Sequence, residues 1–277
     1  MRKFLPLFTA LVFVSLTSGL MAQSGYNLKY NFEKGKTYHY LNTADGAQTQ
    51  EVMGREIKMS MNNNFSVKML VDNVKDGNIE IIASLDSGTI VSKNPMKDTT
   101  MSLEALKDKR SRISLNEYGK ILNKEVLDKV GGFEGFGISQ REYVKFAVLP
   151  GKEIKEGEPW NATTQDTMEI MGSGKIITST STTYTIVGKE NLQGHDCLKL
   201  AYTSEVKSNG SAEIQGMNFT MEGTGKMTGN SYFDPSRGIM VKIDGILDNE
   251  MTLAATGQQN MIIPITQSVK VSQVLMD

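Results

Sequence analysis

The sequence predicts a mainly β fold: a long, strongly curved antiparallel sheet, or half-barrel, that wraps over a few central helices. The first observation is that apolar residues recur at every second position over several long runs. Side chains on a strand alternate between two faces, so each run predicts a strand with one apolar side. The second observation is that turn-forming residues separate the runs, as in "DNVKDGN" (72–78), "GKENLQG" (188–194) and "DPSRG" (234–238). The third is that short stretches with helix-capping residues interrupt the strands mid-chain.

The longest alternating run is "IKMSMNNNFSVKMLV", residues 57–71. At about 3.3 Å per residue it would extend close to 50 Å, so it must curve or bulge. The polar Asn63 interrupts the apolar parity, and we expect the bend there. The side chains predicted to point inward are Ile57, Met59, Met61, Phe65, Val67, Met69 and Val71. Similar alternation predicts strands over 79–91, 198–206, 239–247 and 261–271.

Three helices are expected between two blocks of strands. The first spans 101–109 with Ser102 as its N-cap, and the second spans 123–132 with Asn123 as cap and Gly131 as stop. The third spans 139–151 and must end before Pro150. A sheet that is apolar on one side must be closed, stacked or covered, so we expect these helices to cover the concave face.

The first 22 residues have the order of a secretory signal peptide. Arg2 and Lys3 precede an apolar run from Leu5 to Leu16, and small residues lead to an expected cut after Ala22. No later run approaches the roughly 20 apolar residues of a transmembrane helix. We therefore expect a soluble periplasmic or secreted protein without a transmembrane segment.

Residues 23–277 are expected to form a single β-rich domain. Its halves, 23–148 and 149–277, resemble each other faintly, since "MGREIKMSMNNNFSVKML" (53–70) is similar to "MGSGKIITSTSTTYTIV" (171–187). The sequence leaves open whether this is a duplication or a coincidence between strand-turn-strand patterns. The lone Cys197 cannot form an intramolecular disulfide, so stability must come from an ordinary core.

Three stretches carry a resemblance to known proteins: "YNLKYNFEKGKTYHY" (26–40), "GKEIKEGEPW" (151–160) and "YFDPSRGIMVKIDG" (232–245). They resemble an uncharacterised family of exported Bacteroidetes proteins, a domain of unknown function. The architecture is similar to the LolA, LolB and LppX lipoprotein-carrier fold, a curved sheet over helices that shelters acyl chains. This resemblance implies a ligand role and no catalytic residues, and the role follows from fold analogy alone.

Composition and motifs favour a binding or interaction protein over an enzyme. Of the 30 basic residues, 28 remain once Arg2 and Lys3 are removed, against 31 acidic ones, which argues against a nucleic-acid partner. The chain has neither a phosphate-binding loop nor a Gly-x-Ser-x-Gly elbow, and we expect no cofactor. His195 and Cys197 would share a strand face, as a thiolate pair, a metal half-site or simply a strand end. Because no further ligands lie nearby in the sequence, we expect no metal site.

Methionine is the compositional oddity, with 15 of 17 left after removal of Met1 and Met21. Thioethers can bind Cu(I), but these residues mostly fall on apolar strand faces, where they serve as flexible core filler or as an adaptable lining.

Two functions remain: a carrier of a lipid or another apolar ligand, or a structural or interaction module that binds an envelope protein. The residues predicted to line a ligand site are Met59, Met61, Phe65, Met217, Phe219 and Met221, with Tyr143 and Phe146 opposite.

Two tripeptides resemble the sequon that Bacteroidetes use for O-glycosylation. They are Asp98-Thr99-Thr100 and Asp166-Thr167-Met168, which makes Thr99 and Thr167 candidate glycosylation sites. The surroundings of Thr99, "NPMKDTTM", predict a surface loop.

Overall fold

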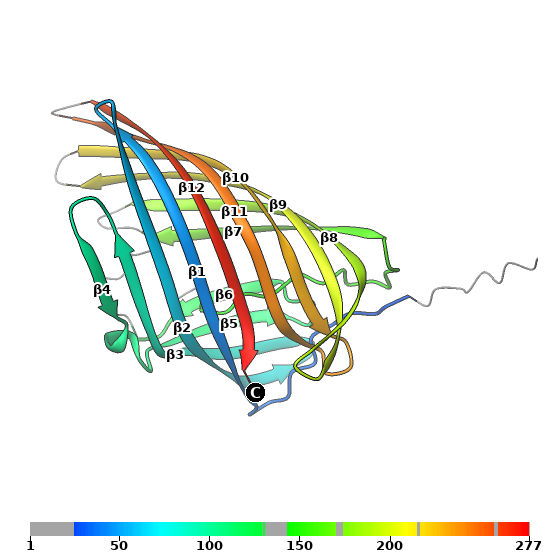
Figure 1. The fold of residues 1–277 in the computed structure, drawn as a ribbon. Helices are drawn as coiled ribbons and strands as arrows, with labels where there is room; N and C mark the ends of the chain where they lie inside the picture. Colours follow the sequence, from blue (N-terminus) through cyan, green and yellow to red (C-terminus); the bar gives the residue numbers. More distant parts are fainter. Residues whose placement is uncertain are drawn as a thin grey trace, which may run out of the picture.

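The computed structural model describes residues 25–128, 130, 143–169, 174–214, 217–257 and 260–276. The signal peptide expected over 1–22 lies outside them. The described residues form one antiparallel sheet of twelve strands, which curls into a half-barrel (Figure 1). The strands are β1 (Thr37–Val52), β2 (Arg55–Lys75), β3 (Asn78–Lys93), β4 (Asp98–Ser102), β5 (Arg110–Asn116), β6 (Ile121–Val126), β7 (Pro159–Glu169), β8 (Lys175–Leu192), β9 (His195–Ile214), β10 (Met217–Asp234), β11 (Ile239–Thr256) and β12 (Met261–Met276).

The strand order is β6-β5-β3-β2-β1-β12-β11-β10-β9-β8-β7, and β4 pairs with β3 beside β5. The first and last strands therefore lie together near the middle of the sheet. The two ends of this order, β6 and β7, are connected by an ion pair in which Lys124 Nζ lies 2.5 Å from Asp166 Oδ2. Their side chains link the two edges of the half-barrel.

Strand β2 confirms the alternation predicted over 57–71. Val67, Met69 and Val71 are fully buried, whereas Lys58 and Lys68 on the other face are exposed. The bend expected at Asn63 is wrong, because the pairing between β2 and β3 runs without interruption there. Irregularities fall instead between Ser66 and Val67, and between Val71 and Asn73. Bulges at these two places increase the local twist and help so long a strand to curve.

Tight turns join most neighbouring strands. Asp76-Gly77 connects β2 to β3 and Gln193-Gly194 connects β8 to β9, with positive φ at both residues of each pair. Two left-handed residues in succession are typical of type I′ hairpin turns, whose twist matches that of the strands. The turns predicted at 72–78 and 188–194 are confirmed.

The three predicted helices are wrong where the structure describes them. Ser102 Oγ does accept the Glu104 N–H (3.2 Å), but only the 3₁₀ turn η1 (Glu104–Leu106) follows. Asn123 is no helix cap, because it lies in β6 opposite Ser114. The part of 139–151 that is described, from residue 143, contains bends and irregular backbone but no helix. Local capping signals are worth about 1 kcal/mol, so burial of Leu103, Leu106 and the strand faces outweighs them.

Two segments without regular secondary structure, not helices, fill one end of the half-barrel. We call residues 26–33 and 143–154 the closing segments. They pair through Tyr26 and Ile154, whose backbone groups exchange hydrogen bonds of 2.7 and 3.0 Å. Tyr30 packs against the rings of Phe32, Phe146 and Phe233. Val67, Met69 and Val71 of β2 belong to the same buried cluster as residues of the closing segments, so the apolar face of β2 is covered at this end by the chain itself.

Candidate functional site

The inward face of the half-barrel changes from buried to half-exposed along each long strand. We call the end near the turns 76–77 and 193–194 the closed end, and the end near the turn 53–54 the open end. In β2 the inward Val67 and Met69 at the closed end are fully buried. Met61 and Met59, toward the open end of the same strand, are only partly buried. The described residues thus fill the concave face at one end and leave apolar surface accessible at the other.

The same gradient is found on the opposite wall. In β10 and β11 the inward residues near the open end alternate with exposed polar neighbours. Phe219, for example, is half-buried between the exposed Asn218 and Thr220. The inward and half-buried apolar residues of β10, β11 and β12 toward this end are Met217, Phe219, Met221, Met227, Leu247, Met251, Leu253, Met261, Ile263 and Ile265.

Six of the eight predicted ligand-lining residues lie on the inward face of the sheet. Met59, Met61 and Phe65 are on β2, and Met217, Phe219 and Met221 are on β10. Strands β1, β12 and β11 separate the two groups, so the curl of the sheet turns one wall toward the other (Figure 1). Met61 and Phe65 also pack against the buried core. A ligand-binding role for these residues remains a prediction.

Tyr143 and Phe146 lie elsewhere. Both are in a closing segment instead of a helix, and Tyr143 is fully buried in the core. Phe146 makes edge-to-face contacts with the rings of Tyr30 and Phe32. These two residues close the end of the half-barrel. They do not lie opposite the open-end residues, because the helix expected over 139–151 to hold them there is not formed in the described part of that range.

Other open-end residues were missed by sequence reasoning. Met251 and Leu253 alternate with Glu250 and Thr252, so parity could have added them to the predicted lining. Met101 on β4 is also half-buried and packs against the core beneath it, opposite Ile90. Its signal was masked by the predicted helix over 101–109.

Inward-facing amides hold a closing segment against the sheet. The Gln273 side chain accepts a hydrogen bond from the Lys145 N–H (2.8 Å) and donates one to the Lys145 carbonyl (3.0 Å). Asn42, directly opposite Gln273 in the sheet, donates to the Tyr143 carbonyl (3.4 Å). These amides satisfy backbone groups that the extended segment could not pair by itself.

Replacing Gln273 by Leu should therefore lower the free energy of unfolding by about 1 to 3 kcal/mol, because two partly buried backbone groups of Lys145 lose their partner. Chemical denaturation measures this loss. The control is Ser272→Ala, a neighbour on the other parity of β12, which should change stability by about 0.5 kcal/mol or less. Equal losses of stability in both variants would contradict the role of Gln273 in holding the closing segment against the sheet.

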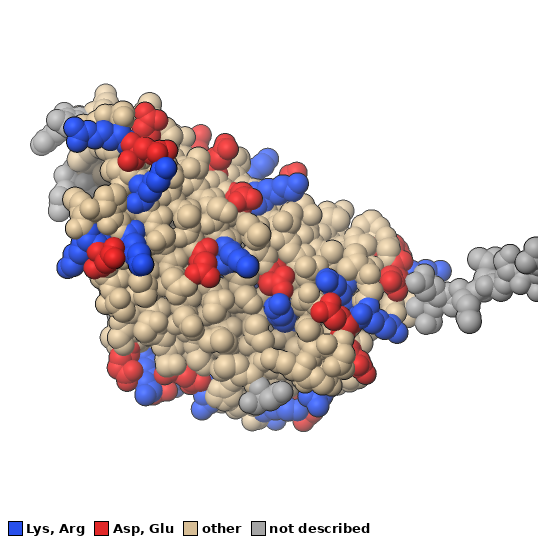
Figure 2. Space-filling model, viewed as in Figure 1, with Lys and Arg blue, Asp and Glu red and all other residues tan. Residues whose placement is uncertain are grey.

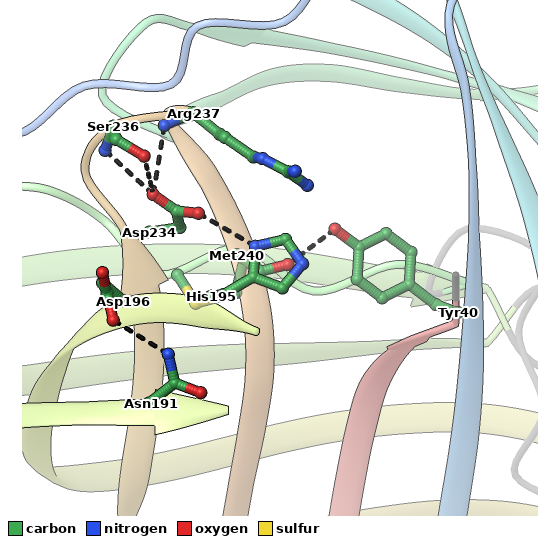
Figure 3. Close-up of polar contacts among 8 residues, drawn as sticks. All are labelled: Tyr40, Asn191, His195, Asp196, Asp234, Ser236, Arg237 and Met240. Atoms are coloured by element: carbon green, nitrogen blue, oxygen red, sulfur yellow. Dashed lines mark hydrogen bonds and ion pairs between the residues drawn. The ribbon is translucent and has the colours of Figure 1, made fainter. Parts of the chain in front are cut away.

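A second polar cluster lies at the closed end (Figure 3). His195 Nδ1 lies 2.9 Å from Asp234 Oδ2, and both side chains are 3% exposed. The other oxygen of Asp234 accepts hydrogen bonds from the Ser236 hydroxyl, the Ser236 N–H and the Arg237 N–H. Since an ionised carboxylate only accepts, the imidazole donates through Nδ1. The cluster fixes the turn 235–238 to the start of β9.

The sequence alone does not reveal this pair, because 39 residues separate its members and "DPSRG" indicates only a turn. The thiolate considered for Cys197 is not supported. The thiol is buried, and this burial, together with the nearby carboxylate of Asp234, raises its pKa to about 12. The thiol is therefore protonated at neutral pH and is a poor nucleophile.

The candidate glycosylation residues both lie in strands. Thr99 is in β4 opposite Ser92, and Thr167 is in β7 opposite Ile177. Both are partly buried. The surface loop expected around Thr99 is limited to residues 94–97. Thr99 itself lies in β4, so its predicted place in a loop is wrong. Glycosylation of either residue remains a prediction.

The outward face is polar. Figure 2 shows Lys and Arg beside Asp and Glu across it, with neither sign gathered into one patch in this view. A shallow, open hollow of about 590 Å³ lies here, over β10, β11, β12 and β1. Lys226, Asp248 and Glu250 are among the residues that line it. A hollow with charges of both signs does not suit an apolar ligand.

Within the described ranges, no three His, Cys, Asp or Glu side chains come together as they would around a metal ion. No helix in the same part of the chain is long and apolar enough to cross a membrane.

Comparisons with known proteins agree with the resemblance to a family without known function. Residues 140–240 match the model of DUF6263, a family of unknown function. No curated protein matches the chain.

Several solved structures are similar over most of their length, but at TM-scores too low to support an argument. A Bacteroides fragilis protein, described as exported and as having a YmcC-like fold, is 9% identical, with a TM-score of 0.22 over 91% of this chain and 97% of that one. An outer membrane channel from Pseudomonas putida F1 is 6% identical, with a TM-score of 0.22 over 89% and 97%. A mutant porin of Rhodopseudomonas blastica is 10% identical, with a TM-score of 0.23 over 86% and 100%. The expected similarity to the lipoprotein-carrier fold is not confirmed.

Proposed function

We propose that the protein is an exported, periplasmic or secreted binding protein that carries a lipid or another apolar ligand in its concave face. It acts by binding and not by catalysis. The observation that supports this most is the gradient of burial along the inward face. Apolar side chains that stay half-exposed at the open end contact water, and an apolar ligand would remove that surface from water.

The kind of residue at the open end supports an adaptable site. Met59 and Met61 lie on one wall, and Met217, Met221 and Met251 lie on the other. Methionine is unbranched and polarizable, so it adjusts to ligands of varied shape. Such a lining suits acyl chains, which need no strict shape matching.

The test is a titration of the purified protein with the fluorescent apolar probe N-phenyl-1-naphthylamine. The variants Met61→Asp and Phe219→Asp should weaken probe binding at least tenfold, because a bound probe would leave the new carboxylate without water. Their matched controls, Ser60→Asp and Thr220→Asp, place the same charge on the outward face of the same strands and should bind as wild type does.

Circular dichroism must show an intact fold in all four variants. Mass spectrometry of organic extracts from the native protein would then identify the ligand. The carrier proposal fails if the wild-type protein binds no apolar probe, or if inward and outward variants lose binding equally.

The alternative is a structural or interaction module of the cell envelope that has no ligand and binds a protein partner through its surface. It is favoured by the closing segments, whose Leu28, Tyr30 and Leu149 belong to the buried core and fill the closed end of the concave face with the chain's own side chains. Absence of both probe binding and extractable ligand would support this alternative.

A further inference from the structure

One buried polar atom on the inward face has no partner. Asn63 is 5% exposed, and its Oδ1 accepts no hydrogen bond among the described residues. In β2 it lies between the inward Met61 and Phe65. Its cross-strand neighbours are Ala44 of β1 and Ile90 of β3. The four adjacent positions on the inward face are therefore apolar, at the depth where the half-exposed part of β2 meets the buried part.

Two nearby amides show what a structural role looks like in this protein. Gln273 and Asn42 also face inward, and both bind backbone groups of a closing segment. Asn63 has a similar burial and the same functional group, yet its oxygen serves neither the sheet nor a closing segment. A buried acceptor without a partner costs free energy that a leucine of similar size would not cost.

We propose that the ligand of the concave face is an amphiphile whose polar end donates a hydrogen bond to Asn63 Oδ1. Its apolar part then extends along Met61 and Met59 toward the open end. This ligand class rests on the proposed function, because a molecule must enter the concave face to reach Asn63. The bound ligand satisfies the acceptor that the empty protein leaves unpaired.

The surroundings of Asn63 also select the charge of the polar end. All four inward neighbours are apolar, so an ammonium group beside Asn63 would be buried without a counter-charge. A carboxylate or phosphate offers only acceptors when ionised and would face another acceptor. A neutral donor such as a hydroxyl or an amide N–H fits, which makes a long-chain alcohol, or a lipid with a hydroxyl or amide group near its chains, the expected class.

The test compares two ligands of matched chain that differ in one donor. Displacement of N-phenyl-1-naphthylamine is measured with 1-dodecanol and with dodecyl methyl ether, whose oxygen cannot donate. The wild-type protein should bind the alcohol about tenfold more tightly, as expected of one hydrogen bond to a buried acceptor. The variant Asn63→Leu should bind both equally, and Asn63→Ala provides the same comparison if the leucine is not accommodated.

The matched control is Asn64→Leu, the outward neighbour on β2, which should keep the wild-type preference. Thermal unfolding should show that Asn63→Leu is at least as stable as wild type, since it removes the unpaired oxygen. A wild-type protein that binds the probe but does not prefer the alcohol would overturn the ligand class and leave the carrier intact. Failure to bind the probe at all would overturn both, and loss of preference in Asn64→Leu as well would overturn the assignment to Asn63.

Discussion

Replacing Asp234 by Ala should lower the free energy of unfolding by about 3 to 5 kcal/mol, because several donors lose a buried carboxylate acceptor at the same time. His195 loses its acceptor at 3% exposure, and the hydroxyl and N–H groups of the turn at Ser236 lose theirs. Urea denaturation at pH 7 measures the loss. The control is Asp196→Ala, since Asp196 is exposed and bonds only Asn191 among the contacts drawn in Figure 3. That change should cost about 1 kcal/mol or less.

The pH dependence gives the pair a second test. Burial of the Asp234 carboxyl opposes its ionisation, but hydrogen bonds from Ser236, His195 and Arg237 outweigh it, so its pKa lies below the usual value. A carboxyl whose pKa is depressed in the folded state stabilises the fold above its unfolded pKa of about 3.9, and this contribution is lost as the pH falls through the folded pKa. The free energy of unfolding of Asp234→Ala, measured as the pH is lowered, should therefore lack the loss that the wild type shows in this range. If the wild type and the variant depend on acidic pH in the same way, Asp234 is not the stabilising carboxylate.

Replacing Met69 by Ala should cost about 2 to 5 kcal/mol, because its fully buried side chain leaves a cavity at the closed end. The adjacent Lys68→Ala removes an exposed side chain from the same strand and should change stability by about 0.5 kcal/mol or less. Phe65 shares the parity of Met69 but is only half-buried, so Phe65→Ala should cost less than the 3 to 5 kcal/mol of a fully buried ring. Similar losses for Met69 and Lys68 would show that the faces of β2 are misassigned.

Alternation predicted the strands because burial on one face requires it over the full length of β2, β9 or β11. Parity also placed Met59, Met61 and Phe219 on the inward face, and turn-forming residues predicted the turns within 72–78, 188–194 and 234–238. The helices failed for a definite reason. Residues 101–109 and 123–132 carry capping residues, but caps act within one turn, whereas Leu103, Leu106 and the pairing of β5 with β6 depend on contacts across the sheet.

The closing segments could not be predicted from alternation at all. Their backbone pairs with distant groups, as when Tyr30 N–H donates to the Glu117 carbonyl and Leu149 N–H donates to the Tyr118 carbonyl. No local period marks such a segment. The importance of Asn63 was hidden similarly: the sequence shows a polar residue in an apolar row, and only the register shows that its oxygen lies among apolar neighbours.

The pairing of β1 with β12 determines how the sheet can be completed. Residues 39–50 pair with residues 265–276, so this contact joins segments more than 200 positions apart. Hairpins such as β2–β3 or β10–β11 can form early from local contacts, whereas so distant a pairing requires costly loop closure and is expected to form late. Until then β1 and β12, which is already able to pair with its sequence neighbour β11, each present an unpaired edge, which is a template for pairing with another chain. When the sixteen-residue β12 pairs with β1, the two halves of the sheet are joined and both open edges are removed at once.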